Sequence, residues 1–444
     1  MFNTIKNAFK TPDVRKRVYY TLLLIVIFRL GCYISVPAVD SVALASLSQG
    51  GIAQLINTIS GGAFSRFSIF AMSITPYITA SIVIQLLAMI IPSLEKLTKE
   101  GGQEGRNKVN RYTKILTIAL AFIEGLGLYL SYKGIFIGAY ADSGFERFIT
   151  GAVVVLAFMA GTAFLMWLGE QISNKGIGNG ISILIFVGII SGLPSAAKMI
   201  YNLVFTGTFS TKNLILALAI IIGTILLVAG VIFVQEAERR IPVQYSKKVV
   251  GRKMVGGQNT HIPLKLAMAG VMPIIFASSF MTFPAMVIQL VNPNITTQTT
   301  GIGNFWRIVY NISIATSSSD VSLKYTIVNA IIYLVLIVGF TFFYTYATFN
   351  PAEISSSIKK NGGFIPGIRT GKSTTEYLSS VITKLTVFGG FFLAVIAIIP
   401  MLLRFTNLNL AFGGTSILIV VGVALETVQQ LESQLVMRHY KGFL

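Results

Sequence analysis

Two stretches that contain glycine resemble phosphate-binding motifs in their residue types and spacing. GKST at 371–374 resembles the end of a P-loop, in which a lysine and a hydroxyl contact a nucleotide phosphate and its magnesium ion. The first glycine of that motif would fall at position 366, where this chain has proline, and no apolar strand leads into it. The other stretch, GIGNG at 176–180, lies between two apolar segments and predicts a tight turn between helices.

Side chains that carry out catalysis or bind metals are scarce. The chain has two histidines, His261 and His439, one cysteine, Cys32, and no HExxH, CxxC or carboxylate pair. Glu124 is the clear case of an acid inside an apolar segment, and it stands alone. Ion-coupled carriers need intramembrane acids or histidines, and enzymes need a nucleophile with its base or a metal set. We therefore expect no catalytic residue, no metal, no cofactor and no enzymatic activity.

The composition predicts that lipid surrounds most of the chain. Of 444 residues, 54% are hydrophobic and 11% are charged, whereas soluble chains carry about 25% charged residues. Ten apolar segments have the roughly 17–25 residues that a bilayer requires. They lie near 18–36, 71–92, 112–132, 146–169, 181–200, 213–235, 266–291, 325–349, 379–403 and 411–431.

The basic residues predict how these segments are oriented. Of the 35 lysines and arginines, 26 fall on alternate connections: the N-terminal tail, 93–114, 170–180, 236–265, 350–384 and the C-terminal tail. By the positive-inside rule, both termini and these loops are cytoplasmic. A split at 200–212 gives five segments in each half, which permits an inverted repeat. The two halves show no convincing similarity in their residues.

Two cytoplasmic loops and one buried charge each allow two interpretations. The loops at 236–265 and 350–384 are long and basic, and the alternation in IPVQYSKKVV predicts a β-hairpin in the first. They are either solvated loops attracted to anionic lipid or projections that dock a large partner. Arg29 lies inside the first apolar segment, at a cost of about 2.5–3.5 kcal/mol on insertion scales. It is either a buried charge with a partner or a residue that lines an aqueous cavity.

From the residues alone, three classes of protein compete: a passive polypeptide channel, a secondary transporter built on an inverted repeat, and a membrane enzyme. Five stretches, however, closely resemble the SecY/Sec61α family, whose bacterial members are the central subunit of the Sec protein-translocation channel. The resemblance runs from about residue 10 to the C-terminus. The stretches are SGGAFSRFSIFAMSITPYITASIVIQLL, MWLGEQISNKGIGNGISILIF, THIPLKLAMAGVMPIIFASS, NPAEISSSIKKNGGFIPGIRTG and FGGTSILIVV.

The resemblance implies an all-α polytopic membrane protein. Its ten transmembrane helices would form two inverted five-helix halves around an hourglass pore. The expected parts are a cytoplasmic tail at 1–17, an N-terminal half at 18–200, an external hinge loop at 201–212, a C-terminal half at 213–431 with cytoplasmic loops at 236–265 and 350–378, and a cytoplasmic tail at 432–444.

A short plug helix at about 57–70 is expected to close the pore at rest. Its two glycines would supply backbone freedom, and Phe64 and Phe67 are expected to pack against the constriction. The plug residues that the resemblance implies are Ser60, Gly61, Gly62, Ala63, Phe64, Ser65, Arg66 and Phe67.

The constriction in this family is a ring of apolar side chains, which hold no hydrated ion and favour dewetting of a narrow neck. Carried over by position, the ring is Ile74, Ile78, Ile181, Ile185, Ile275 and Ile419. The lateral gate is expected between the second and third spans on one side and the seventh and eighth on the other, with Gln85 at this seam. Basic residues expected to contact phosphates and carboxylates of docked partners are Arg252, Lys253 and Arg369.

The function that the resemblance implies is passage of unfolded secretory polypeptides across the bacterial plasma (inner) membrane. Signal sequences and membrane-protein helices would leave sideways into lipid, driven by transfer of apolar surface out of water. The chain holds no energy source, so the SecA ATPase or the translating ribosome would drive transport. The expected partners are the SecE and SecG membrane subunits, SecA, the ribosome through its RNA phosphates, signal peptides, nascent polypeptides and anionic lipid.

Overall fold

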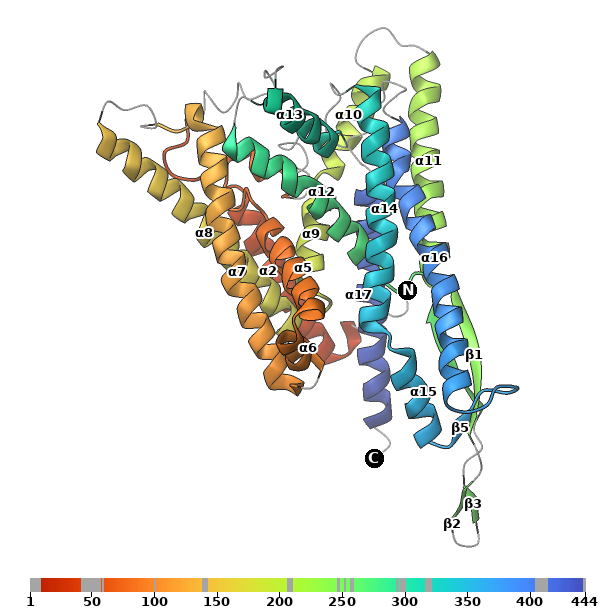
Figure 1. Cartoon of the computed structure of the whole chain (residues 1–444). Helices are drawn as coiled ribbons and strands as arrows, with labels where there is room; N and C mark the ends of the chain where they lie inside the picture. Colours follow the sequence, from red (N-terminus) through yellow and green to blue (C-terminus); the bar gives the residue numbers. More distant parts are fainter. Residues whose placement is uncertain are drawn as a thin grey trace.

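The computed structural model describes thirteen stretches of the chain, and α-helices predominate in them (Figure 1). The described residues are 9–40, 57, 60–99, 101–137, 143–205, 211–245, 248–250, 253–255, 259–292, 295, 301–315, 322–403 and 414–441. The helices are α2 Pro12–Gly31, α5 Thr75–Ile90, α6 Pro92–Lys99, α7 Gly102–Ser131, α8 Gly144–Lys175, α9 Gly180–Ile190, α10 Leu193–Phe205, α11 Thr211–Glu236, α12 Met272–Val291, α13 Gly301–Ile314, α14 Leu323–Thr348, α15 Pro351–Lys360, α16 Lys372–Leu403 and α17 Gly414–Lys441.

The long helices form two groups, with α12 slanting between them (Figure 1). One group holds α2 and α5 to α9, and the other holds α11, α14, α16 and α17. The groups meet where α12 contacts α5 and α7, and again where α17 contacts α9. Between these two contacts, apolar side chains from both groups of helices pack together.

Most of the described long helices have the length and hydropathy of membrane spans, although fewer than the ten predicted do so. Seven of them are long and apolar enough to cross a bilayer, or eight if the bent pair α5 and α6 counts as one span. That pair turns by 107° at the break before Pro92, where proline cannot continue the preceding helix. Each of the ten predicted segments overlaps a described helix, and the count of ten spans stays a prediction.

The two basic loops meet in one small sheet. Strand β1 (Glu238–Tyr245) pairs antiparallel with β4 (Asn259–Lys265), so the predicted hairpin is confirmed. Strand β5 (Gly363–Phe364) from the second loop adds to the other edge of β1. Beyond them, β2 (Lys248–Val250) and β3 (Lys253–Val255) form a second, smaller ribbon, which projects furthest from the helices (Figure 1).

A separate apolar core fixes these loops to the helical body. It joins residues of β1 and β4 to α15 and the first turns of α16; its buried members are Ile241, Val243, Leu264, Ile358, Ile365, Leu378, Val381 and Ile382. Sequence reasoning treated the loops as two projections, whereas the structure makes them one platform. We call this sheet with its core the cytoplasmic platform, after the side that the charge pattern predicts.

Candidate functional site

The turn between α8 and α9 determines where two of the candidate isoleucines lie. Gly178 has φ +81°, a value that favours glycine. The side-chain oxygen of Asn179 accepts a hydrogen bond from the backbone N–H of Ile181 at 3.2 Å and so caps α9. The backbone N–H of Ile177 donates to Thr21 Oγ1 of α2 at 3.1 Å. The tight turn predicted for GIGNG is therefore confirmed, and it fixes α9 against α8 and α2.

Gly180 lets α8 and α9 touch, because a Cβ added there would lie 1.9 Å from the carbonyl oxygen of Gly169. We expect Gly180→Ala to force the two backbones apart and to destabilise the protein by about 1–3 kcal/mol. The measurement is the midpoint of thermal unfolding in detergent. The matched control is Gly223→Ala in α11, where an added Cβ meets nothing within 4 Å. Equal midpoints for the two variants would contradict the close approach.

The six candidate isoleucines come together in the interior. Ile74 and Ile78 come from the start of α5, Ile181 and Ile185 from α9, Ile275 from α12 and Ile419 from α17. Five of them are buried in one apolar cluster, with 1–7% of their surface exposed, and Ile181 is partly buried against it. Since α5 and α9 belong to one group, α17 belongs to the other and α12 lies between them, both groups supply this central cluster. That these six side chains ring a pore stays a prediction.

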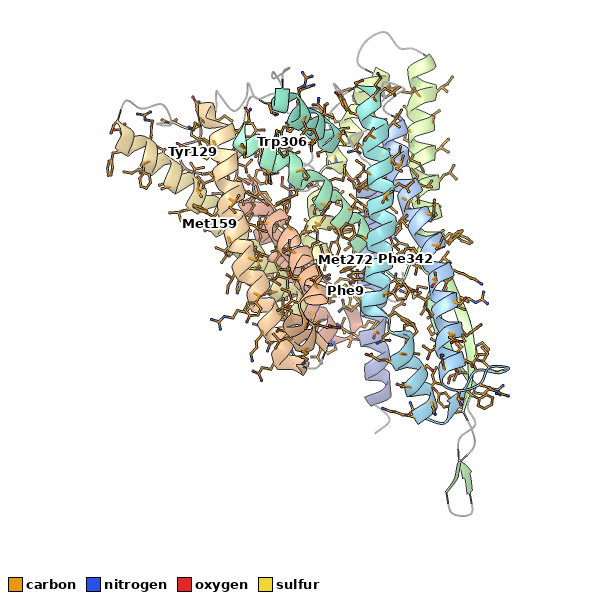
Figure 2. All side chains as sticks on the ribbon, viewed as in Figure 1. Phe9, Tyr129, Met159, Met272, Trp306 and Phe342 are labelled. Carbon is orange, nitrogen blue, oxygen red and sulfur yellow. The ribbon has the colours of Figure 1, made fainter. Side chains whose placement is uncertain are left out.

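The central cluster holds few groups that could bind an ion or react with a substrate; among its buried members these are the Cys32 thiol and the Tyr333 hydroxyl. Besides the helices that carry the six isoleucines, α2, α8, α11, α14 and α16 also supply buried members. Nearly all of these members are aliphatic or aromatic. In Figure 2, Met272, at the start of α12, lies near the middle of the molecule, between the two groups. A closed apolar core of this kind resists the passage of water and ions.

The segment expected to be a plug helix is folded, but not as an α-helix. Among residues 60–74 the only helical element is the three-residue 3₁₀ turn η1 (Phe64–Arg66). Positive φ values at Gly61 (+64°), Gly62 (+87°) and Phe67 (+42°) interrupt helical geometry on both sides of it. Residues 41–56, 58 and 59 lie outside the described residues. The expectation of a short helix is therefore wrong for 60–70.

Hydrogen bonds within the segment replace those of a helix. The hydroxyl of Ser60 accepts from the backbone N–H of Phe64 at 3.2 Å, and Asn57 Oδ1 accepts from the N–H of Ser65 at 2.9 Å. The Ser65 hydroxyl donates to the Gly62 carbonyl at 2.8 Å. Serine and asparagine favour such local bonds over helix. The segment is thus a compact, self-bonded turn structure.

Phe64 and Phe67 do not pack against the isoleucines, contrary to the sequence expectation. They belong to a second buried cluster, between the segment and α7, α8 and α12. The Phe67 ring centroid lies 5.4 Å from that of Tyr132, 5.7 Å from that of Phe136 and 6.5 Å from that of Phe158. We call Phe64, Phe67, Tyr132, Phe136 and Phe158 the aromatic anchor. The candidate plug residue that does lie in the central cluster is Ala63, which is fully buried.

Arg29 has a partner, as one of the two interpretations of this charge predicts. It is half-buried, and its Nη1 atom donates to the carbonyl oxygen of Gly61 at 3.1 Å. Ser191, which ends α9, contacts the same oxygen at 3.2 Å. Sequence reasoning did not single out Ser191. The signal available was a hydroxyl beside a glycine inside the apolar segment predicted at 181–200.

Other predicted site residues lie apart from the central cluster. Gln85 is half-buried in α5 and donates to Ser81 Oγ of the same helix at 3.1 Å. Arg369 is exposed between β5 and α16, and its carbonyl oxygen accepts from Thr374 Oγ1 at 2.9 Å. Lys253 begins β3, and only its backbone is described. Arg252 lies outside the described residues. The structure brings neither Lys253 nor Arg369 to the isoleucines, and both belong to the projecting end.

Known proteins resemble this chain in sequence along its whole length. The SecY family model matches residues 68–428. A curated relative from Halalkalibacterium halodurans, "Protein translocase subunit SecY", is 43% identical over 450 residues, and the alignment covers 100% of both chains. The similarity to this relative therefore extends over the whole of both chains.

Two solved structures share the fold at lower identity. One is described as "The plug domain of the SecY protein stablizes the closed state of the translocation channel and maintains a membrane seal"; it is 21% identical, with a TM-score of 0.63 over 94% of this chain and 92% of that one. The other, "Sec61 in the Canine ribosome-channel complex from the endoplasmic reticulum", is 19% identical, with a TM-score of 0.60 over the same shares.

Proposed function

The chain belongs to the SecY family, and from this premise we propose that it is a protein-conducting channel of a cell membrane. It passes unfolded secretory polypeptides and releases signal sequences and membrane-protein helices sideways into lipid. The observation that carries the proposal is the 43% identity to a protein translocase subunit over the full length of both chains. The multi-pass helical fold and the scarcity of ionisable groups in its interior support the proposal.

The central cluster is proposed as the seal of this channel. Its isoleucines lie buried between the two groups of helices, and in this proposal they keep water and ions out of the resting channel. When a polypeptide enters, the same side chains surround it. Because aliphatic groups offer no specific hydrogen bond, they accept polypeptides of many sequences. A secondary transporter would instead need a polar site with charged or broken-helix ligands near the midplane.

The lateral exit is proposed along the contacts of α12 with α5 and α7. These are the helices of the seventh, second and third predicted spans. Apolar residues of α12 contribute to both the central cluster and the second cluster. Pro284 removes one backbone hydrogen bond inside α12, which favours bending of this helix there. Movement of α12 away from α5 and α7 would open the interior to lipid.

The cytoplasmic platform is proposed as the docking site for the partners that supply energy. The solved relative in the ribosome complex is bound to a ribosome, and we propose ribosome and SecA docking for this chain. The exposed Arg369 and the ribbon of β2 and β3 lie on this platform. Arginine and lysine suit contacts with RNA phosphates and with carboxylates. SecE and SecG are the further membrane subunits proposed, and the bacterial plasma membrane with both termini cytoplasmic is the proposed location.

The function is tested by reconstitution of the chain with SecE, SecG, SecA and ATP in vesicles. A radiolabelled secretory precursor is added, and product that survives external protease is measured. We expect protected precursor that depends on both the channel and ATP. Vesicles that take up a small solute down an ion gradient but protect no precursor would favour a transporter and overturn the proposal.

A further inference from the structure

In residues 60–70, which we call the plug segment, the carbonyl oxygen of Gly61 accepts hydrogen bonds from side chains of two helices. Arg29 Nη1 of α2 donates to the Gly61 oxygen at 3.1 Å, and the Ser191 hydroxyl at the end of α9 approaches it at 3.2 Å. These donors are 32 and 130 positions away in the sequence. Neither bond is part of a helix or sheet. The Gly61 oxygen is therefore a single point at which α2, α9 and the plug segment are joined.

The two donors are unequal. The Ser191 hydroxyl has one proton, and it also lies 2.6 Å from the carbonyl oxygen of Gly188 in its own helix. That shorter bond competes for the proton, so the hydroxyl serves Gly61 only in part. Arg29 carries a permanent charge and has further donors to spare. A charge-assisted hydrogen bond is stronger than a neutral one, so Arg29 is the principal donor.

The backbone at Gly61 fits this contact only without a side chain. Its φ of +64° is strained for other residues. A Cβ added there would lie 2.6 Å from Ser191 Oγ, 2.7 Å from Arg29 Nη1 and 2.9 Å from the Cα of Gly188. The first two neighbours are side-chain ends, but the third is backbone of α9. The glycine thus brings its carbonyl directly against α9.

A second cationic contact joins Arg66, at the end of η1, to Tyr33, just after the end of α2. The guanidinium carbon of Arg66 lies 4.2 Å from the ring centroid of Tyr33, and that of Arg29 lies 6.0 Å from the same ring. Tyr33 is 59% exposed. Cation–π contacts at exposed sites are weak, so this contact can form and break readily. Both cationic contacts therefore lie near the C-terminal end of α2, one at Gly61 and one at Tyr33.

The other side of the segment is held in a different way. Phe67 is fully buried in the aromatic anchor. Its carbonyl oxygen accepts from the backbone N–H of Val36 at 2.8 Å, and the N–H of Ile69 donates to the carbonyl of Ile34 at 2.9 Å. Withdrawal of this part would expose large apolar surface and break a backbone pairing. Residues 60–63 bury less apolar surface: Ala63 lies in the central cluster, and the Ser60 carbonyl oxygen lies 3.9 Å from Cys32 Sγ, a weak donor.

We propose that Arg29 and Ser191 form a polar latch that keeps the plug closed, and that the plug opens at Gly61 while it stays fixed at the aromatic anchor. The inference rests on the channel function proposed above. A polypeptide that parts α2 from α9 withdraws both donors from one oxygen at once. Ala63 then leaves the central cluster, and Phe67 remains in place. Arg29 and Ser191 are positioning residues in this scheme, since they act on the plug and not on the polypeptide.

Arg29→Gln tests the principal donor, because it removes the charge and retains a shorter amide donor. We expect about a tenfold rise in resting ion conductance in planar bilayers, equivalent to about 1.4 kcal/mol. Export of a precursor with a weakened signal sequence should rise as well, because less free energy is needed to open the plug. Arg29→Lys should restore part of the seal. Arg147→Gln, an exposed arginine in α8, is the matched control and should leave both readouts unchanged.

Ser191→Ala and Tyr33→Leu test the weaker contacts. Each should raise the conductance by less than Arg29→Gln. Their controls are Ser195→Ala, whose hydroxyl is exposed and bonds only to the Gly192 carbonyl at 2.7 Å among the contacts described, and Tyr33→Phe, which keeps the ring. In the Arg29→Gln background, Ser191→Ala should add less than it does alone, because both act on one oxygen. Full additivity would place the two donors on separate contacts and contradict the latch.

A disulfide between Ser60→Cys and the native Cys32 distinguishes the latch from a passive contact, because it fixes the residue before Gly61 to the end of α2 and leaves Gly61, Arg29 and Ser191 unchanged. The Cys32 Sγ atom lies 3.9 Å from the Ser60 carbonyl oxygen, so a cysteine at position 60 is within reach of the native thiol. Oxidation should lower transport of a normal precursor about tenfold (~1.4 kcal/mol), and reduction should restore it. Transport at full rate with the bond intact, or failure of the bond to form, would overturn the latch. Loss of transport by the unmodified protein in the same vesicles would instead contradict the channel function.

Discussion

Serine in place of Ile78, Ile185 and Ile275 together is expected to make the resting channel conduct ions. These three side chains come from α5, α9 and α12 and lie in the central cluster with 3–7% exposure. Serine removes most of the apolar volume and adds a hydroxyl that holds water. A narrow apolar neck that has become polar fills with water. We expect resting conductance in planar bilayers to rise by about a hundredfold, which corresponds to about 2.7 kcal/mol.

Two controls separate the seal from general damage. Valine at the same three positions keeps the cluster apolar and should leave conductance near that of the parent protein. Serine at Ile222, Ile225 and Ile331, which are 55–62% exposed on α11 and α14, removes the same groups from the outer surface. That variant should insert less well and should not leak. If the outer triple leaked as much as the inner one, the central cluster would not be the barrier to ions.

Reversal of one charge on the cytoplasmic platform is expected to have the second largest effect. Arg369 is exposed in the turn between β5 and α16. In Arg369→Glu, an attraction to phosphate or carboxylate becomes a repulsion at the docking surface. We expect motor- or ribosome-driven transport to fall by about tenfold or more (~1.4 kcal/mol). The measurements are protease-protected precursor per minute and binding of the motor or the ribosome to channel-containing vesicles.

The control for this charge reversal is Lys198→Glu. Lys198 is an exposed lysine of α10, which lies at the opposite end of the molecule from the platform (Figure 1). It undergoes the same change of charge and should transport normally. Both variants should reach the membrane in normal amounts, because neither position is buried. Normal docking and transport by Arg369→Glu would remove this residue from the proposed platform.

The central cluster shows how much of the site could be predicted. The positions of the isoleucines in the sequence, together with the resemblance, selected six residues that the fold does bring into one cluster. Composition alone could not have selected them, because an isoleucine in an apolar segment looks the same whether it faces lipid or the interior. Exposed isoleucines such as Ile222 and Ile331 illustrate the point.

The plug segment shows where prediction failed. Its two glycines were expected to supply backbone freedom, and both have positive φ, but the helix expected around them is not formed at 60–70. The packing of Phe64 and Phe67 was predicted wrongly, because aromatic side chains fill whichever apolar space lies nearest in the folded protein. Here that space is formed by Tyr132, Phe136 and Phe158, which are 65 or more positions away in the sequence.

The sequence by itself determined the membrane class, the predicted orientation and the scarcity of catalytic and metal-ligating groups. These properties depend on hydropathy and charge summed along short stretches, which each segment carries wherever it lies. Only the tertiary structure decided that the two basic loops share a sheet, that Ala63 and not Phe64 faces the isoleucines, and that Arg29 and Ser191 meet at Gly61. Each of these joins residues from separate helices or loops, and the packing of those elements alone determines which side chains come within a few ångströms.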